Sequence, residues 1–160
     1  MIDINADIIS NKSIGNVVLG ENVDRYLNDM YSNHTVRFFD YFLPDDEKRM
    51  AYVVDEIITI ATLSNGLIIS VGCNEKYKGR YMNSLCTGMR MSDVINLTNE
   101  QRIFNGCIIV NDDFGFSIEL PTPYDEIADD IEHVPLDLVL KEMRVADYYS
   151  WKPKNKLIRE

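Results

Sequence analysis

The sequence predicts an α+β fold, in which a twisted antiparallel sheet of hairpins carries two short helices packed on one face. Three observations predict it. Apolar and polar residues alternate in several short runs, which is the period of a half-buried strand. An Asn-Gly dipeptide at 65–66 separates two apolar runs, and this is the strongest local signal for a hairpin. Two stretches, near 21–31 and 92–97, have apolar spacing typical of a helix instead.

In the N-terminal half, residues 1–20 contain one or two short strands that end at glycines. A helix is expected over 21–31, with Asn22 as its N-cap. Its apolar stripe, at the spacing i, i+3, i+4 and i+7, is formed by Val23, Tyr26, Leu27 and Met30. Aromatic and β-branched residues predict a strand over 35–43. The run 52–63 predicts another strand, which the Asn-Gly turn joins to a strand over 67–71.

In the C-terminal half, Ser92 is the expected cap of a two-turn helix. Strands are expected over 107–110 and 114–120, with a turn between them. Leu136, Leu138 and Leu140 alternate with other residues and predict the last strand. The outline of 20–27 also resembles that of 90–97, either through an old internal duplication or by chance.

The length of 160 residues is typical of one domain. We expect a single α+β domain over 1–150 and a basic, frayed tail over 151–160. The three cysteines, an odd number at irregular spacing, predict buried free thiols in a reducing compartment. No stretch reads as a signal peptide or a membrane span, so we expect a cytoplasmic protein without a membrane partner.

Motifs for catalysis are missing from the sequence. His34 and His133 lie far apart and have no metal-ligand spacing. No phosphate-binding glycine loop and no nucleophile elbow occurs. We therefore expect no catalytic residues, no metal site and no cofactor.

The strongest compositional signal is the net charge of −10, with a pI of about 4.6. Such a chain is repelled by phosphate backbones, so we expect no nucleic-acid partner. No Lys or Arg occurs between Arg102 and Lys141. The acids there alternate with aromatic residues that can anchor an interface while the acids attract a basic partner. The residues expected to bind a partner are Asp112, Asp113, Phe114, Glu119, Tyr124, Asp125, Glu126, Asp129, Asp130 and Glu132.

A family resemblance rests on a small acidic domain with four segments in this order. They are Val18-Leu19-Gly20 entering a helix, the hairpin Leu63–Val71, the loop Tyr77-Lys78-Gly79, and Gly88–Val94. In this outline, which spans about residues 14 to 140, the chain resembles the immunity proteins of bacterial contact-dependent growth inhibition and related polymorphic toxin systems. The resemblance implies a non-catalytic protein that binds the C-terminal domain of a cognate toxin, often a nuclease, in the cytoplasm. Binding would cover the active or substrate-binding surface of the toxin.

Two alternatives to toxin inhibition remain open from the sequence. A non-catalytic adaptor or regulatory module would use the acidic face for another partner. A small enzyme is the other, since the lack of a known motif does not exclude activity. A solvated acidic surface without a partner would give the same charge pattern.

Overall fold

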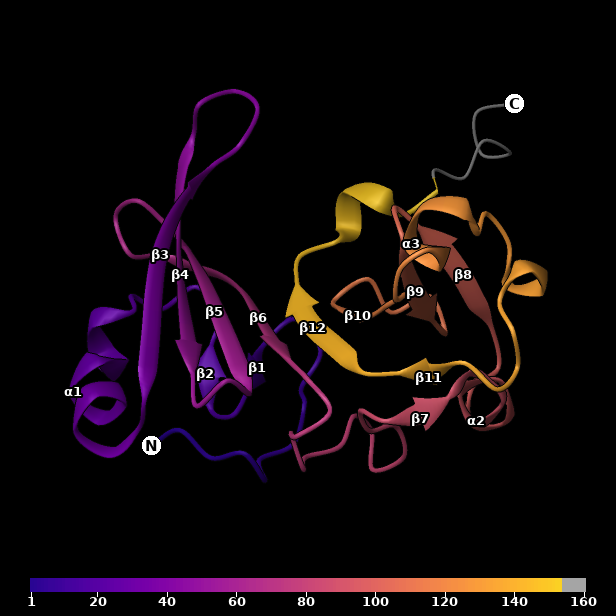
Figure 1. Cartoon of the computed structure of the whole chain (residues 1–160), viewed down its shortest axis with the longest axis horizontal. Coiled ribbons are helices and arrows are strands. Elements are labelled where there is room, and N and C mark those ends of the chain that lie inside the picture. Colours follow the sequence, from indigo (N-terminus) through magenta and orange to yellow (C-terminus); the bar gives the residue numbers. More distant parts are fainter. Residues whose placement is uncertain (154–160) are drawn as a thin grey trace.

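The structure, a computed structural model, describes residues 1–153. Eight strands form one antiparallel sheet, and the helices are short. Figure 1 shows the sheet curving from α1 at one end to α3 at the other. This architecture confirms the predicted α+β class with its antiparallel sheet of hairpins.

The first half of the chain begins with a small hairpin and a helix and continues into four strands. Its elements are β1 (Ser13–Ile14), β2 (Val17–Val18), α1 (Asp24–Asn33), β3 (Val36–Phe42), β4 (Lys48–Val54), β5 (Ile58–Leu63) and β6 (Ile68–Cys73). The expected hairpin at Asn65-Gly66 joins β5 to β6. Gly66 has a φ of 89°, but Asn65 does not have the positive φ that a two-residue Asn-Gly turn requires. The N–H of Gly66 donates to the carbonyl of Leu63 at 2.9 Å, so Gly66 follows the turn and is not at its centre.

The second half repeats a short helix followed by four strands of the sheet. Its elements are β7 (Met89–Arg90), α2 (Met91–Leu97), β8 (Gln101–Phe104), β9 (Cys107–Val110), β10 (Phe116–Glu119), α3 (Tyr124–Ile127), the 3-10 turn η1 (Ile131–His133), β11 (Val139–Leu140), β12 (Glu142–Ala146) and the 3-10 turn η2 (Tyr149–Trp151). Strands β7 and β11 form a separate two-stranded ladder.

The strand order is β3-β4-β5-β6-β12-β10-β9-β8. The two halves therefore meet at β6 and β12, which pair antiparallel with Val71 opposite Val145. The order on one side of this junction mirrors the order on the other, and each set of four strands follows its own helix. The two similar segments, 20–27 and 90–97, each lead into the helix of their own half, but α1 begins at Asp24 and α2 at Met91, which are not equivalent positions of the segments.

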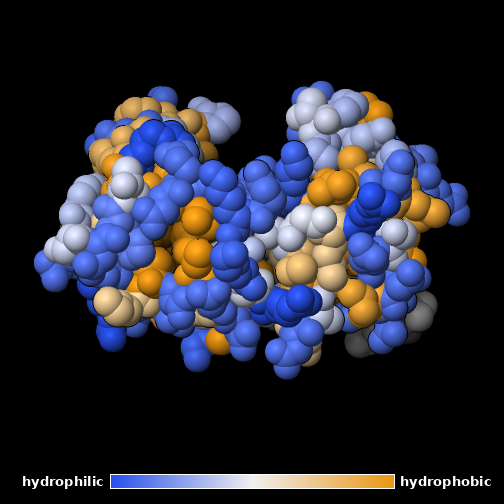
Figure 2. Space-filling model, turned by 60° about the horizontal axis from the view of Figure 1, so that its bottom comes forward, coloured by the Kyte–Doolittle hydropathy of each residue, from blue (hydrophilic) through white to orange (hydrophobic). Residues whose placement is uncertain are grey.

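One face of the sheet holds the core. Helix α1 contributes Tyr26 and Met30 to it, and α2 contributes Met91 and Val94, all buried. On the opposite face, small side chains form a cross-strand row that runs over β4, β5 and β6 and crosses the junction to β12: Ala51, Ala61, Ser70 and Ala146. Because these side chains are short, that face is hollow at its centre. The space-filling view shows the two halves as lobes with a notch between them (Figure 2).

Three expectations need correction. The single strand predicted over 52–63 is two strands, because Asp55 and Glu56 form a turn with φ of 54° and 53°. The last strand of the sheet is β12 and not the strand predicted over Leu136 to Leu140. Within that predicted stretch only β11 is a strand, and Leu136 is 61% exposed. The N-cap of α2 is Arg90, whose backbone N–H donates to the Asp93 carboxylate, and not Ser92.

At the other helix, Asn22 lies one residue before the N-cap position and its side-chain oxygen accepts from the N–H of Asp24. The packed chain continues beyond the domain boundary predicted at 150. Trp151 stacks on Tyr148 with ring centroids 4.6 Å apart. The rest of the predicted tail, 154–160, lies outside the described residues. None of the helices in residues 1–153 is long and apolar enough to cross a membrane.

Candidate protein-binding surface

The acidic segment between β10 and β12 covers one edge of the sheet. Its 3-10 turn η1 packs along β8, the last strand on that side. Its helix α3 lies against the β8–β9 turn, where a side chain at Gly106 would come within 2.8 Å of the Asp125 carbonyl oxygen. The missing side chain at this position, which has a φ of +79°, therefore lets the segment approach closely.

Three predicted residues meet around Arg102 on β8. The Arg102 guanidinium lies 3.6 Å from the Asp112 carboxylate, at the β9–β10 turn. Asp129 and Asp130 line a shallow pocket with Arg102. Asp112 and the pair Asp129-Asp130, which are at least 17 positions apart in sequence, thus share one surface, and Arg102 is the cation that the described residues place beside them.

The remaining acids of the segment point into solvent. We call the six exposed carboxylates Asp112, Asp125, Glu126, Asp129, Asp130 and Glu132 the acidic edge. Among the residues that the structure describes, Asp112 is the one member of the acidic edge with an ion pair. Ile127 lies between two of these acids and is 60% exposed, while Tyr124 is half-buried against the core. The surface therefore combines uncompensated negative charge with an apolar contact.

Three predicted partner-binding residues do not belong to this surface. Phe114 is completely buried, so it cannot anchor an interface in this fold. The carboxylate of Asp113 turns inward and accepts hydrogen bonds from the Tyr81 and Ser10 hydroxyls, each at 2.5 Å. Glu119 lies on the sheet and receives a hydrogen bond from Arg144 at 2.9 Å. The alternation of acidic and aromatic residues in the sequence therefore did not show which side chains point inward and which point into solvent.

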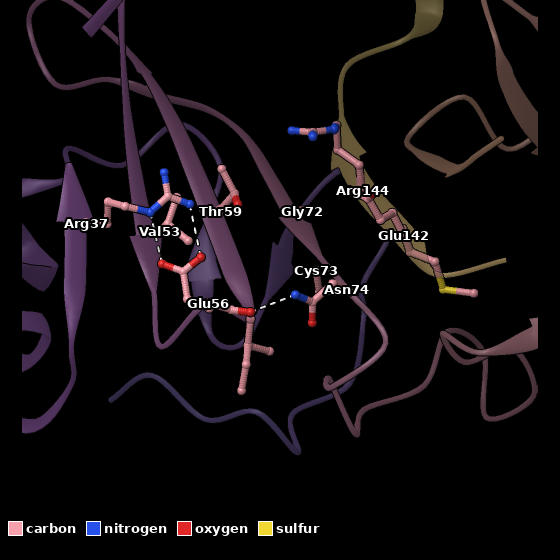
Figure 3. Close-up of a pocket in the computed structure, with 11 residues that line it drawn as sticks. Arg37, Val53, Glu56, Thr59, Gly72, Cys73, Asn74, Glu142 and Arg144 are labelled. Atoms are coloured by element: carbon pink, nitrogen blue, oxygen red, sulfur yellow. Dashed lines mark hydrogen bonds and ion pairs between the residues drawn. The ribbon is translucent and has the colours of Figure 1, made fainter. Parts of the chain in front are cut away.

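The hollow face of the sheet is a second feature, which the sequence did not predict. Arg144 projects from β12 at the junction of the halves, between two pockets that it lines. Its guanidinium donates to Glu119 and, at 2.8 Å, to the Ser70 hydroxyl. The guanidinium lies over the backbone of Gly72, where an added Cβ would be 3.3 Å from the Arg144 Cζ. Figure 3 shows Arg144 facing the paired Arg37 and Glu56 across one pocket.

The other pocket, of about 520 Å³, has the size of a small-molecule site. Its polar lining includes Tyr41, Arg49, Ser70, Arg144 and Tyr148. The arginines are already paired with carboxylates, Arg49 with Glu47 at 3.1 Å. Asp147 also lines this pocket, so the pocket carries no excess positive charge and is less distinctive chemically than the acidic edge.

Of the three cysteines predicted to be buried, only Cys73 is buried, whereas Cys86 and Cys107 are half-buried. We expect Cys73 and Cys107 to be poor nucleophiles. Burial raises the pKa of Cys73 to about 12 and that of Cys107 to about 11, so both remain protonated thiols at pH 8. Reactive cysteines need a lowered pKa. At pH 8 both should react with a chromogenic disulfide reagent at least about tenfold more slowly in the native protein than in urea. Fast labelling of Cys73 in the native state, located by mass spectrometry, would contradict this expectation.

Within residues 1–153, no group of three or more His, Cys, Asp or Glu side chains is placed to hold a metal ion. Comparisons of the chain with protein-family models, with curated proteins and with solved structures give no match. The function is therefore argued from the geometry of the surfaces described above.

Proposed function

We propose that this chain is an immunity protein that binds the toxic domain of a contact-dependent growth inhibition or related polymorphic toxin system. The acidic edge is the observation that carries the proposal. Five of its six carboxylates have no ion pair within the described residues and all six are exposed. Solubility does not require so dense a patch of one sign, whereas such a patch speeds the association with a basic protein.

The expected partner is a basic toxin domain, such as a nuclease. A nuclease holds phosphate groups with Lys and Arg, and a row of exposed carboxylates can occupy the same positions. Ile127 and Tyr124 would supply apolar contact inside the charged rim. In this mechanism the immunity protein covers the active or substrate-binding surface of the toxin and carries out no chemistry itself.

The test is rescue from toxicity together with co-purification. The product of the neighbouring upstream gene is expressed in cells with and without this protein, and growth is followed. We expect survival only in the presence of this protein, and a complex that co-purifies from the surviving cells. Neither rescue nor a complex would remove the toxin proposal.

Charge reversal of Asp112, Asp129 and Asp130 to Lys should then slow association with the toxin by about 10- to 100-fold at low salt. Dissociation should change less, because exposed charges act mainly on the encounter. Stopped-flow mixing at two ionic strengths measures both rates. Asp113 is left unchanged, since its carboxylate holds the fold together.

The matched control reverses three exposed carboxylates of the first half of the chain and its following loop: Asp7, Asp46 and Glu75. Both triple variants change the net charge equally, so an effect of total charge alone would slow association to the same extent in each. Equal slowing in the two variants would show that the acidic edge is not the binding surface.

The pocket that Arg144 and Asp147 line supports a second candidate, the binding of a small molecule by an enzyme or a regulatory module. Its volume of about 520 Å³ is the specific observation in favour. A thermal-shift screen would separate the two, because a ligand at a hundredfold excess over its Kd stabilises the protein by about 2.7 kcal/mol.

A further inference from the structure

The two edge strands of the sheet, β3 and β8, differ in how they are covered. Figure 1 shows β3 and β8 at opposite ends of the sheet. The edge at β8 is covered by η1 and the acidic segment. No strand or helix within residues 1–153 pairs with the outer side of β3. The equivalent edge of the first half therefore remains open.

Strand β3 has the properties of a pairing edge. It runs for seven residues in an unbroken register with β4. Three of its aromatic side chains are exposed: Phe38 at 45%, Phe39 at 41% and Phe42 at 64%. Soluble proteins usually protect such an edge with Lys, Pro or a bulge. The stretch from Val36 to Phe42 contains no Lys, Pro or bulge, and its two charged side chains, Arg37 and Asp40, are each paired with an opposite charge of the same chain.

The backbone pattern identifies which groups of β3 face outward. The N–H of Asp55 donates to the carbonyl of Thr35 at 2.7 Å, and the N–H of Leu43 donates to the carbonyl of Glu47 at 2.9 Å. Because antiparallel strands alternate, the odd residues of β3 bond to β4. The outward N–H and C=O groups belong to Val36, Phe38, Asp40 and Phe42.

We propose that β3 pairs with β3 of a second copy of this chain, antiparallel and centred on Phe39. In that register Val36 lies opposite Phe42 of the other copy and Phe38 lies opposite Asp40. Every outward N–H and C=O group of the strand then finds a partner. A shift of the centre by one residue in either direction leaves some of these groups unpaired, so this register satisfies the most hydrogen bonds.

The side chains also favour self-pairing in this register. Arg37 lies opposite Tyr41 of the other copy, and Phe39 lies opposite Phe39 of the other copy. No two like charges are directly opposite. The two Asp40 carboxylates are diagonal neighbours, and each already has a cation, Lys48, at 3.5 Å. The strand is thus complementary to itself, which is what a two-fold interface requires.

Net charge opposes the same association. Two chains of −10 repel each other, and salt screens this repulsion with a Debye length of about 10 Å at 0.1 M. Dimerisation should therefore strengthen as salt increases. The dimer would carry its two β8 edges at its outer ends, free for other partners. This proposal does not depend on the toxin proposal.

Sedimentation velocity from about 5 to about 500 µM protein, at low and high salt, tests the proposal directly. We expect a concentration-dependent dimer that becomes more abundant at high salt. The variant Asp40→Pro removes an outward N–H, which an edge strand tolerates, and should be monomeric. The matched control Asp40→Ala keeps the N–H and should still dimerise. Circular dichroism checks that both variants are folded.

Cysteine cross-linking tests the register. Facing residues in a non-hydrogen-bonded antiparallel pair have Cα atoms about 4.5 Å apart, within the range of a disulfide. Phe39→Cys should therefore give a disulfide-linked dimer under mild oxidation. Tyr41→Cys, on the same face, would lie about 13 Å from its copy and should not. The unsubstituted protein controls for the native cysteines.

Three results would overturn the proposal. These are a monomer at every concentration and salt, a dimer that persists in Asp40→Pro, or cross-linking through residue 41 in place of residue 39. A protein that is monomeric alone, and whose Asp40→Pro variant no longer binds a toxin, would instead assign the β3 edge to that partner.

Discussion

Replacing Asp113 by Ala should lower the free energy of unfolding by about 2–3 kcal/mol. The same change at Asp112 should cost only about 1 kcal/mol, because its φ of 54° lies in the left-handed region that Asp tolerates better than Ala. The two residues are neighbours in sequence and carry the same charge. Asp112 is exposed and has one surface ion pair, which contributes little. Asp113 accepts three hydrogen bonds, from Ser10, Tyr81 and the N–H of Gly115.

Loss of the Asp113 carboxylate leaves the Tyr81 hydroxyl without its acceptor. Tyr81 is 5% exposed and stacks on the buried Phe116 with centroids 3.9 Å apart. Burial raises its pKa, and the hydrogen bond to Asp113 adds to the effect, so the hydroxyl remains a proton donor throughout the neutral range. An unpartnered buried hydroxyl costs about 1–3 kcal/mol.

Urea denaturation of the single variants and of Tyr81→Phe with and without Asp113→Ala measures this network. In the double-mutant cycle we expect a coupling of about 1 kcal/mol or more between Tyr81 and Asp113. Equal stability of the Asp112→Ala and Asp113→Ala variants would show that the network contributes nothing. The contrast also decides which of the two acids belongs in a binding experiment.

The sequence predicted the elements that have clear local signals. The aromatic run over 35–43 contains β3, the helical apolar spacing over 21–31 contains most of α1, and Asn65-Gly66 lies in the connection between β5 and β6. The hairpin at Asp55 and Glu56 was missed because Asp is common in a turn with positive φ but Glu is not, and a glycine is usual at the second position. The structure compensates locally: Asp55 accepts from the Thr35 N–H, and Glu56 pairs with Arg37.

The sequence contains a second Asn-Gly dipeptide, which also predicts a hairpin. Asn105-Gly106 joins β8 to β9, and both residues have positive φ, so the same Asn-Gly reasoning predicts this hairpin. Strand β12 is different. Its five residues lie beside polar segments and gain their place through pairing with β6 and β10. Such long-range partners are not encoded in local periodicity.

Only part of the candidate surface could be predicted from the sequence. Charge alone identified the acidic edge, because Asp, Glu and the absence of Lys or Arg are visible in a sequence. Which side chains point outward was not visible, since Phe114 lies two residues from the exposed Asp112 and is fully buried. The cleft at Arg144 depends on the meeting of β6 and β12, so it required the fold.

Replacing Arg144 by Met should destabilise the protein by about 1–3 kcal/mol at pH 7, because the side chains of Arg144 and Glu119 are only 27% and 29% exposed. Its guanidinium joins three neighbouring strands through Glu119 on β10 and Ser70 on β6. Glu119 lies opposite Glu142 in the ladder, so without the cation two carboxylates face each other. Burial, followed by the charge of Glu119, already raises the pKa of Glu142.

The pH dependence separates loss of the cation from loss of packing. Protonation of Glu142 removes the repulsion, and burial and the charge of Glu119 hold its pKa above the usual range of a Glu. The destabilisation by Arg144→Met should therefore shrink as the pH falls from 7 through this raised pKa. The double variant Arg144→Met with Glu119→Gln should recover more than half of the loss at pH 7. Urea denaturation at pH 7 and pH 4.5 measures both effects.

Arg102→Met is the matched control, since Arg102 also pairs with two carboxylates, Glu100 and Asp112, but is 41% exposed. Water screens that cluster, so its loss should cost less than about 1 kcal/mol at either pH. Similar losses for the two arginines would mean that position in the sheet is irrelevant. A much larger, pH-dependent loss of stability at Arg144 would show that its charge compensates the facing carboxylates of Glu119 and Glu142 at the junction of the halves.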